Sequence, residues 1–139
     1  MIGMILVTHG RLAEELRSAM EHVVGAQRNV DTVCIGPDDD MDDRRAEIEA
    51  CIGRCDTGDG VVLLTDMFGG TPTNISAMFI KQNEVEIVTG VNLPMVIKLA
   101  SQNRETTLSD LAREVEEQGK QSIYRTGALL EPQKLKKDA

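Results

Sequence analysis

Four short runs rich in Val, Ile and Leu constrain the fold of this chain more than any other feature. They occupy Met4–Val7, Val30–Ile35, Val61–Leu64 and Val85–Val88. None alternates strictly between apolar and polar residues, which is typical of parallel strands that are covered on both faces. Longer stretches with helical periodicity separate the runs. This alternation predicts an α/β fold in which helices flank both faces of an open, mainly parallel sheet.

The stretches between the runs each gather apolar residues on one helical face. We expect five helices, over about residues 12–24, 41–55, 72–81 and 94–100 and from Thr107 onward. Gly25 is expected to end the first helix and Pro72 to start the third, and the spacing of Thr107 and Asp110 indicates a capping box. We expect one domain over residues 1–128, with the flavodoxin-like strand order 2-1-3-4, and a polar C-terminal tail over residues 129–139.

A last short segment, Ser122–Arg125, has the composition of a strand. No hairpin partner follows it, so we expect it to pair at an edge of the sheet, either in its own subunit or in another. An unprotected sheet edge is a natural site of dimerisation. We therefore expect a short C-terminal edge strand, paired in its own subunit or across a dimer.

Composition and charge exclude two classes of partner. The chain has 15 Lys and Arg against 23 Asp and Glu, which gives a net charge of −8 and a pI near 4.7. A nucleic-acid-binding protein needs a basic surface, and three aromatic residues, Phe68, Phe79 and Tyr124, provide no platform on which bases could stack. We therefore expect neither nucleic acid nor an acidic membrane surface as a partner.

The three cysteines indicate a reducing compartment. Cys34, Cys51 and Cys55 form an odd set without metal-finger spacing, in a chain large enough to fold without disulfides. The apolar amino terminus lacks the basic segment of a signal peptide, and the polar Thr8–Gly10 end it far short of a membrane span. We expect a cytoplasmic protein that is not embedded in a membrane.

The chemistry is expected where the strands end. In an open parallel sheet, ligands bind beyond the carboxyl ends of the strands, at the point where the strand order reverses. With the order 2-1-3-4, His9 after the first strand and Asp66 after the third emerge side by side. Imidazole can act as a nucleophile near neutral pH, and a carboxylate that accepts its Nδ1–H would leave Nε2 as the attacking atom. The alternatives are a surface or capping histidine and an aspartate that only ends a strand or caps a helix. The second histidine, His22, is expected inside the first helix near its apolar face and is interpreted as structural.

A glycine-rich turn follows Asp66 and leads into the third helix. Gly69 and Gly70 allow the backbone to approach a ligand, and Thr71 adds a hydroxyl at a helix start, where free amides attract anions. These three residues are the candidate phosphoryl-binding group. No lysine follows the glycines, which argues against a nucleotide triphosphate loop. A simple tight turn remains the alternative.

Two further clusters could suggest a metal. The acidic run Asp38–Asp43 offers hard oxygen ligands, but negative charge in the first turn of a helix also complements the helix dipole. Cys51 and Cys55 stand one helical turn apart without a second pair, so packing in the core is the better interpretation. We therefore expect no metal and no cofactor.

In order and spacing, Thr8–Gly10, Asp66–Asn74 and Gly90–Met95 resemble the IIA component of the mannose-type (mannose/fructose/sorbose) bacterial sugar phosphotransferase system. The resemblance implies a phosphotransferase component, in which His9 accepts a phosphoryl group on Nε2 from the phosphocarrier HPr and passes it to a IIB protein, for sugar uptake or regulation. It also implies that Asp66 pairs with the histidine, that Thr71 lies near the phosphoryl group, and that a homodimer exchanges its last strand. No IIB domain follows Ala139, so the acceptor is expected to be a separate chain.

Three other functions stay open from the sequence. Some relatives of this kind serve a dihydroxyacetone kinase system instead of a sugar transporter. A non-catalytic small-molecule binding module would use the same fold. A receiver domain would be phosphorylated on Asp66, but it needs an acidic pair after the first strand to hold magnesium, and Thr8 and His9 occupy that place.

Overall fold

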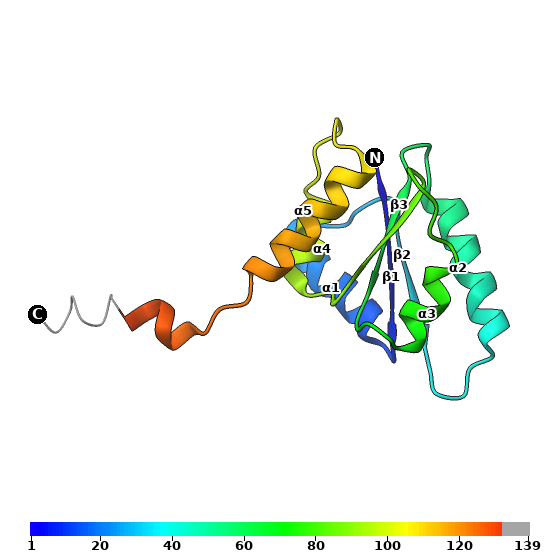
Figure 1. Ribbon diagram of the computed structural model, residues 1–139, viewed down its shortest axis with the longest axis horizontal. Coiled ribbons are helices and arrows are strands. Elements are labelled where there is room, and N and C mark those ends of the chain that lie inside the picture. Colours follow the sequence, from blue (N-terminus) through cyan, green and yellow to red (C-terminus); the bar gives the residue numbers. More distant parts are fainter. Residues whose placement is uncertain (132–139) are drawn as a thin grey trace, which may run out of the picture.

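A four-stranded parallel sheet forms the centre of the protein (Figure 1). The computed structural model describes residues 1–131. The strands are β1 (Gly3–His9), β2 (Val30–Ile35), β3 (Val61–Thr65) and β4 (Val85–Thr89), in the order β2-β1-β3-β4. All three neighbouring pairs run parallel. The α/β class and the strand order 2-1-3-4 predicted from the sequence are confirmed.

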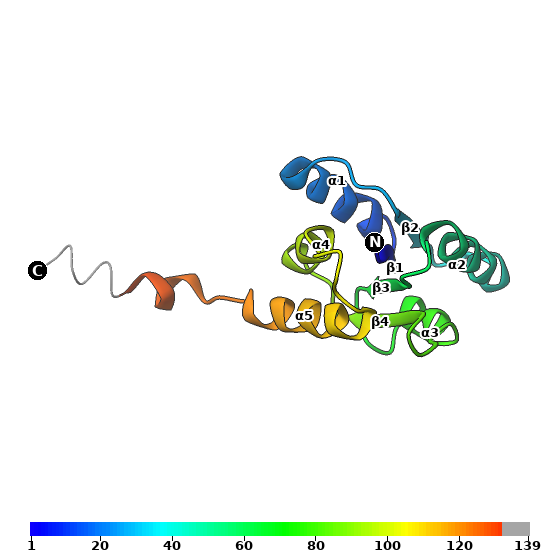
Figure 2. The same ribbon diagram turned by 90° about the horizontal axis from the view of Figure 1, so that it is seen from above.

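Five helices cover the two faces of this sheet. They are α1 (Leu12–Val24), α2 (Met41–Cys55), α3 (Thr71–Ala77), α4 (Leu93–Ala100) and α5 (Leu108–Gln121). Figure 2 shows α1, α4 and α5 on one side of the strands and α2 and α3 on the other. A sixth, short helical segment follows at residues 126–131.

Alternate residues of the strands pack into two separate hydrophobic cores, one on each face of the sheet. Met4, Leu6, Val62 and Leu64 pack with the residues of α1, α4 and α5. Their neighbours along the strands, including Ile5 and Leu63, pack with α2 and α3. Each fully buried Leu or Ile side chain stabilises the fold by about 1.5–3 kcal/mol relative to exposure, so both faces of the sheet contribute. This explains why the strand sequences lack polar alternation.

The strand register brings the two central carboxyl ends together. β1 lies between β2 and β3, with His9 opposite Ile35 and Val7 opposite Thr65. The chain leaves β3 at Asp66, the residue after Thr65. His9 and Asp66 therefore emerge next to each other at the switch point, as expected from the sequence.

One helix, α3, ends elsewhere than the sequence predicts. α3 ends at Ala77 instead of near Lys81, because Phe79 and Ile80 bond to carbonyls three residues back and the backbone then pairs with β4 through a Lys81–Val85 bridge. α5 continues past Gly119 to Gln121. Gly119 lies against Met95 of α4, where a Cβ would come within 2.5 Å of its Sδ. That glycine permits close helix packing and does not end the helix.

Residues 122–125 form no strand and make no β-pairing with any part of residues 1–131. After α5 the chain leaves the body of the molecule (Figure 1), and Ile123 and Tyr124 are 78% and 63% exposed. Pairing within the same subunit, one of the two expectations for this segment, is therefore not observed. Of the tail predicted over residues 129–139, residues 129–131 lie in the short helical segment, and residues 132–139 lie outside the described residues. Within residues 1–131, no helix is long and apolar enough to cross a membrane.

Candidate functional site

His9 and Asp66 form a hydrogen-bonded pair at the carboxyl ends of β1 and β3. His9 Nδ1 lies 2.9 Å from Asp66 Oδ2, and the backbone N–H of His9 donates to the same oxygen at 3.0 Å. The other oxygen, Oδ1, accepts the backbone N–H of Met67 at 3.1 Å. A carboxylate only accepts hydrogen bonds, so this geometry places the imidazole proton on Nδ1 and the free lone pair on Nε2.

The environment keeps Asp66 ionised. Burial alone would raise the pKa of this carboxyl, but the hydrogen bonds from the backbone and ring of His9 outweigh that effect and lower the pKa below its ordinary value. The Asp66 side chain is 14% exposed and the His9 side chain 46%. The pair therefore combines a shielded carboxylate with an imidazole that a second protein can reach.

Gly70 contacts the outer edge of the imidazole. A Cβ at this position would lie 2.7 Å from His9 Cε1 and 3.3 Å from Nε2, so a larger residue would displace the ring. Gly70 is also the N-cap of α3. The turn after Asp66 therefore contacts the imidazole at two places, through the carboxylate at Nδ1 and through Gly70 beside Cε1 and Nε2.

A hollow of about 220 Å³ lies beside the imidazole. Its lining residues come from three carboxyl-end segments and are His9, Gly10, Ile35, Gly36, Pro37, Met41 and Thr71. The structure thus brings Thr71, the first residue of α3, to the same space as the histidine. Gly69 is exposed, with φ near +83° and open space around it, and it does not line the hollow.

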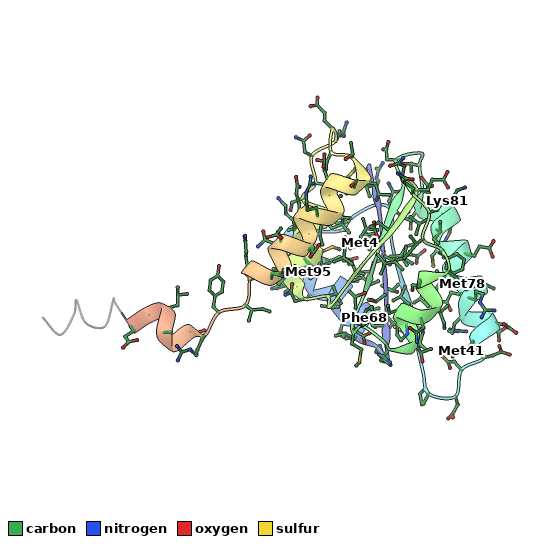
Figure 3. All side chains as sticks on the ribbon, in the orientation of Figure 1. Met4, Met41, Phe68, Met78, Lys81 and Met95 are labelled. Carbon is green, nitrogen blue, oxygen red and sulfur yellow. The ribbon has the colours of Figure 1, made fainter. Side chains whose placement is uncertain are left out.

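The apolar residues of this end are unusually exposed. Phe68 is 86% exposed, and Met67 beside it is also exposed. Figure 3 places Phe68 and Met41 at the same end of the molecule. Exposed large apolar side chains beside a reactive group are typical of a protein interaction site.

Sequence reasoning missed three threonines behind the site. Thr65 is the last residue of β3, Thr89 is the last residue of β4, and Thr73 lies in the first turn of α3. Their hydroxyl oxygens lie within 2.9 Å of one another in a chain that ends at the Met67 carbonyl. The only sequence signal was a threonine at the end of each of two apolar runs.

The other candidate residues have structural roles. Asp39 accepts the backbone N–H of Gly36, and Asp40 is the N-cap of α2. No group of three His, Cys, Asp or Glu side chains in residues 1–131 is placed to hold a metal ion. Burial raises the pKa of the Cys51 thiol to about 12, which keeps it protonated and unreactive.

His22 lies in the last turn of α1 and is exposed. Ten residues separate it from Leu12, the start of the helix, which corresponds to about 15 Å along the axis. It therefore lies at the opposite end of α1 from the site. Its exposure corrects the expectation that it sits near the apolar face of the helix.

Comparison with known proteins gives a consistent result. A family described as PTS system fructose IIA component matches residues 3–116. The mannose-specific EIIAB component of the PTS system of Escherichia coli K12 is 28% identical over 124 residues, which are 88% of this chain and 38% of that protein. The chain therefore spans well under half the length of that relative.

Two further similar proteins are of comparable length. The fructose-specific EIIA component of the PTS system of Bacillus subtilis 168 is 26% identical over 88% of this chain and 85% of its own length. Among solved structures, the mannose/sorbose-specific IIA subunit of the phosphotransferase system from Enterococcus faecalis has a TM-score of 0.78 and 27% identity, with 88% of this chain and 92% of that chain covered.

Proposed function

Because this chain belongs to the family described as PTS system fructose IIA component, we propose that it relays phosphoryl groups through His9. The family assignment makes it a mannose-type phosphotransferase component in sugar phosphotransfer. In the proposed relay, His9 accepts a phosphoryl group from HPr and passes it to a separate IIB protein, for sugar uptake or regulation. The observation that carries the proposal is the His9–Asp66 pair with Nε2 directed away from the carboxylate.

In the proposed transfer one N–P bond forms as another breaks, and the step requires no metal or cofactor. The Nε2 lone pair attacks the phosphorus of the donor's phosphohistidine, the new N–P bond forms in line, and the old N–P bond breaks to return the donor imidazole. The proton stays on Nδ1 throughout, hydrogen-bonded to Asp66. The carboxylate offsets positive charge that develops on the ring, and transfer to the acceptor reverses the same steps.

Gly69, Gly70 and Thr71 are proposed to hold the phosphoryl oxygens. Thr71 shares the hollow with His9, so its hydroxyl can donate to an oxygen of a group on Nε2. Gly70 leaves room for that group beside the ring because it has no Cβ. Gly69 and Gly70 supply backbone N–H groups at the turn into α3. An open hollow suits this role better than a deep pocket, because the phosphoryl group must be released to the acceptor.

The exposure of His9 supports two successive partners. Both donor and acceptor must reach the same nitrogen, and 46% of the side chain is exposed. The net charge of −8 favours fast encounter with a partner that has a basic face, with a rate that falls as salt rises.

We further propose a cytoplasmic homodimer. β4 is an edge strand, and apart from the Lys81–Val85 bridge at its start its outer edge pairs with no segment in residues 1–131. Ile123 and Tyr124 lie exposed on the segment that leaves the body, so pairing of residues 122–125 with the partner's sheet would cover both. All three cysteines are free thiols, as expected in a reducing compartment.

Phosphoryl labelling tests the relay. The protein is incubated with phosphoenolpyruvate, enzyme I and HPr, and the label is then exposed to alkali and to mild acid. We expect one label that survives alkali and is lost in acid, as phosphohistidine is. His9→Ala should abolish it, and His22→Ala, a matched change at an exposed histidine, should leave it intact. Label on His22, an acyl phosphate on Asp66, or no label on the wild type would contradict the proposal.

A further inference from the structure

Three threonine hydroxyls connect the sheet to the turn that carries Asp66. The Thr73 hydroxyl donates to the Met67 carbonyl at 2.8 Å and lies 2.7 Å from Oγ1 of Thr65. Thr65 Oγ1 in turn lies 2.9 Å from Oγ1 of Thr89. Thr65 and Thr73 are both buried. The ends of β3 and β4 and the first turn of α3 are thus joined by one hydrogen-bonded chain.

This chain ends on the residue that fixes the Asp66 carboxylate. The Met67 carbonyl accepts from Thr73, and the Met67 N–H donates to Asp66 Oδ1 at 3.1 Å. That bond leaves Oδ2 for the ring and backbone of His9. Because peptide units are planar, a restraint on the Met67 carbonyl limits rotation of the adjoining backbone. The Thr73 hydroxyl is therefore linked to the His9 imidazole through Met67 and Asp66.

The turn has little other support on this side. Met67, Phe68 and Gly69 are exposed, so packing does not hold them. The Asn74 side chain reaches the Gly69 carbonyl only at 3.4 Å, and Asn74 is itself exposed. The buried Thr73 hydroxyl is therefore the side-chain anchor of the Met67 carbonyl, and its loss would leave that carbonyl without a partner within residues 1–131.

We infer that Thr73 is a positioning residue for phosphoryl transfer at His9. It acts by holding the Met67 backbone, so that Asp66 stays aimed at Nδ1 and Nε2 keeps its lone pair free. The inference rests on the proposed function, because it concerns the same imidazole. A misplacement of about 1 Å at a reacting group can cost on the order of 100-fold in rate, so a residue that touches no phosphoryl group can still matter.

Three variants of the full chain separate the hydroxyl from the shape of the side chain. Thr73→Val removes the hydroxyl and keeps the volume, and Thr73→Ser keeps the hydroxyl. Thr32→Val is the matched control, because Thr32 lies half-buried on β2 and its hydroxyl makes no hydrogen bond within residues 1–131. We expect Thr73→Val to slow phosphoryl transfer to His9 by about tenfold or more. Thr73→Ser and Thr32→Val should transfer at close to the wild-type rate.

A second readout requires no phosphoryl donor. Nitrogen-15 NMR of the imidazole reports which ring nitrogen carries the proton. We expect the Nδ1–H tautomer to predominate in the wild type and Thr73→Ser, and a larger share of Nε2–H in Thr73→Val. This measurement tests the role of Thr73 even if the wild type takes up no phosphoryl group, so failure of the relay and failure of this inference remain distinguishable.

Two results would overturn the inference. One is a folded Thr73→Val protein with the wild-type tautomer and transfer rate. The other is a Thr73→Ser protein as impaired as Thr73→Val, since the hydroxyl would then not be the relevant group. If Thr73→Val does not fold, Thr73→Ala, which removes the same hydroxyl without adding volume, takes its place beside Thr73→Ser. Equal tautomer populations in that pair would likewise reject it.

Discussion

Asp66 uses its two carboxylate oxygens for different donors. Oδ2 accepts both N–H groups of His9, and Oδ1 accepts the Met67 N–H. All three bonds favour the ionised form, which is why the pKa of Asp66 lies below its ordinary value in spite of burial. The same bonds that orient the His9 imidazole therefore also contribute to folding stability.

The stability contribution of Asp66 should depend on pH in a defined direction. Because its folded pKa is lowered from 3.8, the contribution is fully present above about pH 4 and fades as pH falls through the folded pKa. Urea unfolding of the wild type and Asp66→Asn should show the largest difference in unfolding free energy near pH 6 and a smaller one at pH 2–3. A difference that stays constant or grows toward low pH would contradict this account.

Gly70 should be intolerant of the smallest side chain. Gly70→Ala places a methyl group 2.7 Å from His9 Cε1, so the ring must move, and we expect transfer to His9 to slow by about tenfold or more. Gly53→Ala is the matched control, because an added Cβ there has nothing within 4 Å. It should leave the transfer rate unchanged and stabilise α2 by about 0.5–1 kcal/mol. A wild-type transfer rate for Gly70→Ala would show that the ring is not confined there.

The His9–Asp66 pair could be predicted from the sequence, but the threonine hydroxyls behind it could not. His9 and Asp66 each follow an apolar run, and parallel strands bring such ends together at one edge. Thr73 carries no comparable signal, because its contacts depend on how the turn folds back over β3. From the sequence alone, a threonine in the first turn of a helix cannot be told apart from an ordinary surface polar residue.

At the scale of elements, side chains cap three of the helices. The Asp40 side chain accepts a backbone N–H at the start of α2, as do Asn92 for α4 and Thr107 for α5. The Thr107 bond to the Asp110 N–H is the half of the predicted capping box that the structure shows. Such caps fix where a helix begins and leave its end to packing.

Removal of the α5 cap should cost stability alone. Thr107→Ala leaves the Asp110 N–H without its partner, and we expect the unfolding free energy to fall by about 1 kcal/mol. Thr106→Ala is the neighbouring control, since the Thr106 hydroxyl makes no hydrogen bond in the described part of the chain. Both changes lie at the start of α5 and should leave phosphoryl transfer unaffected. Equal losses in the two variants, measured by urea unfolding, would refute a capping role for Thr107.

Starts of elements were better predicted than their ends. The start of α5 followed from Thr107 and that of α3 from Pro72, because caps and prolines are local signals. The ends of α3 and α5 depend instead on partners distant in the sequence. A bridge to β4 shortens α3, and Met95 packs on Gly119 within α5.

At the scale of the whole molecule, the arm after α5 is the feature that a single chain leaves unexplained. Ile123 and Tyr124 lie exposed on a segment that projects from the body (Figure 1). The sequence predicted strand character here, but a strand needs a partner. Composition therefore marks the segment as unusual, and in the proposed homodimer its position would depend on a second copy.

The proposed dimer should depend on this arm. Ile123→Asp puts a charge on the segment that is expected to pair with a second sheet, so sedimentation should show a shift from dimer toward monomer. Val23→Asp is the control, since Val23 is an exposed apolar residue on the body of the molecule, in α1. It should sediment like the wild type. A wild-type protein that is already monomeric, or an Ile123→Asp dimer, would contradict strand exchange.

His9 and Asp66 are 57 residues apart in the sequence and meet only when β1 pairs with β3. Neither strand alone offers a prepared nucleophile. If His9 accepts phosphoryl groups as proposed, a chain in which β1 has not yet paired with β3 would lack the oriented imidazole. Phosphoryl acceptance would then be limited to folded molecules.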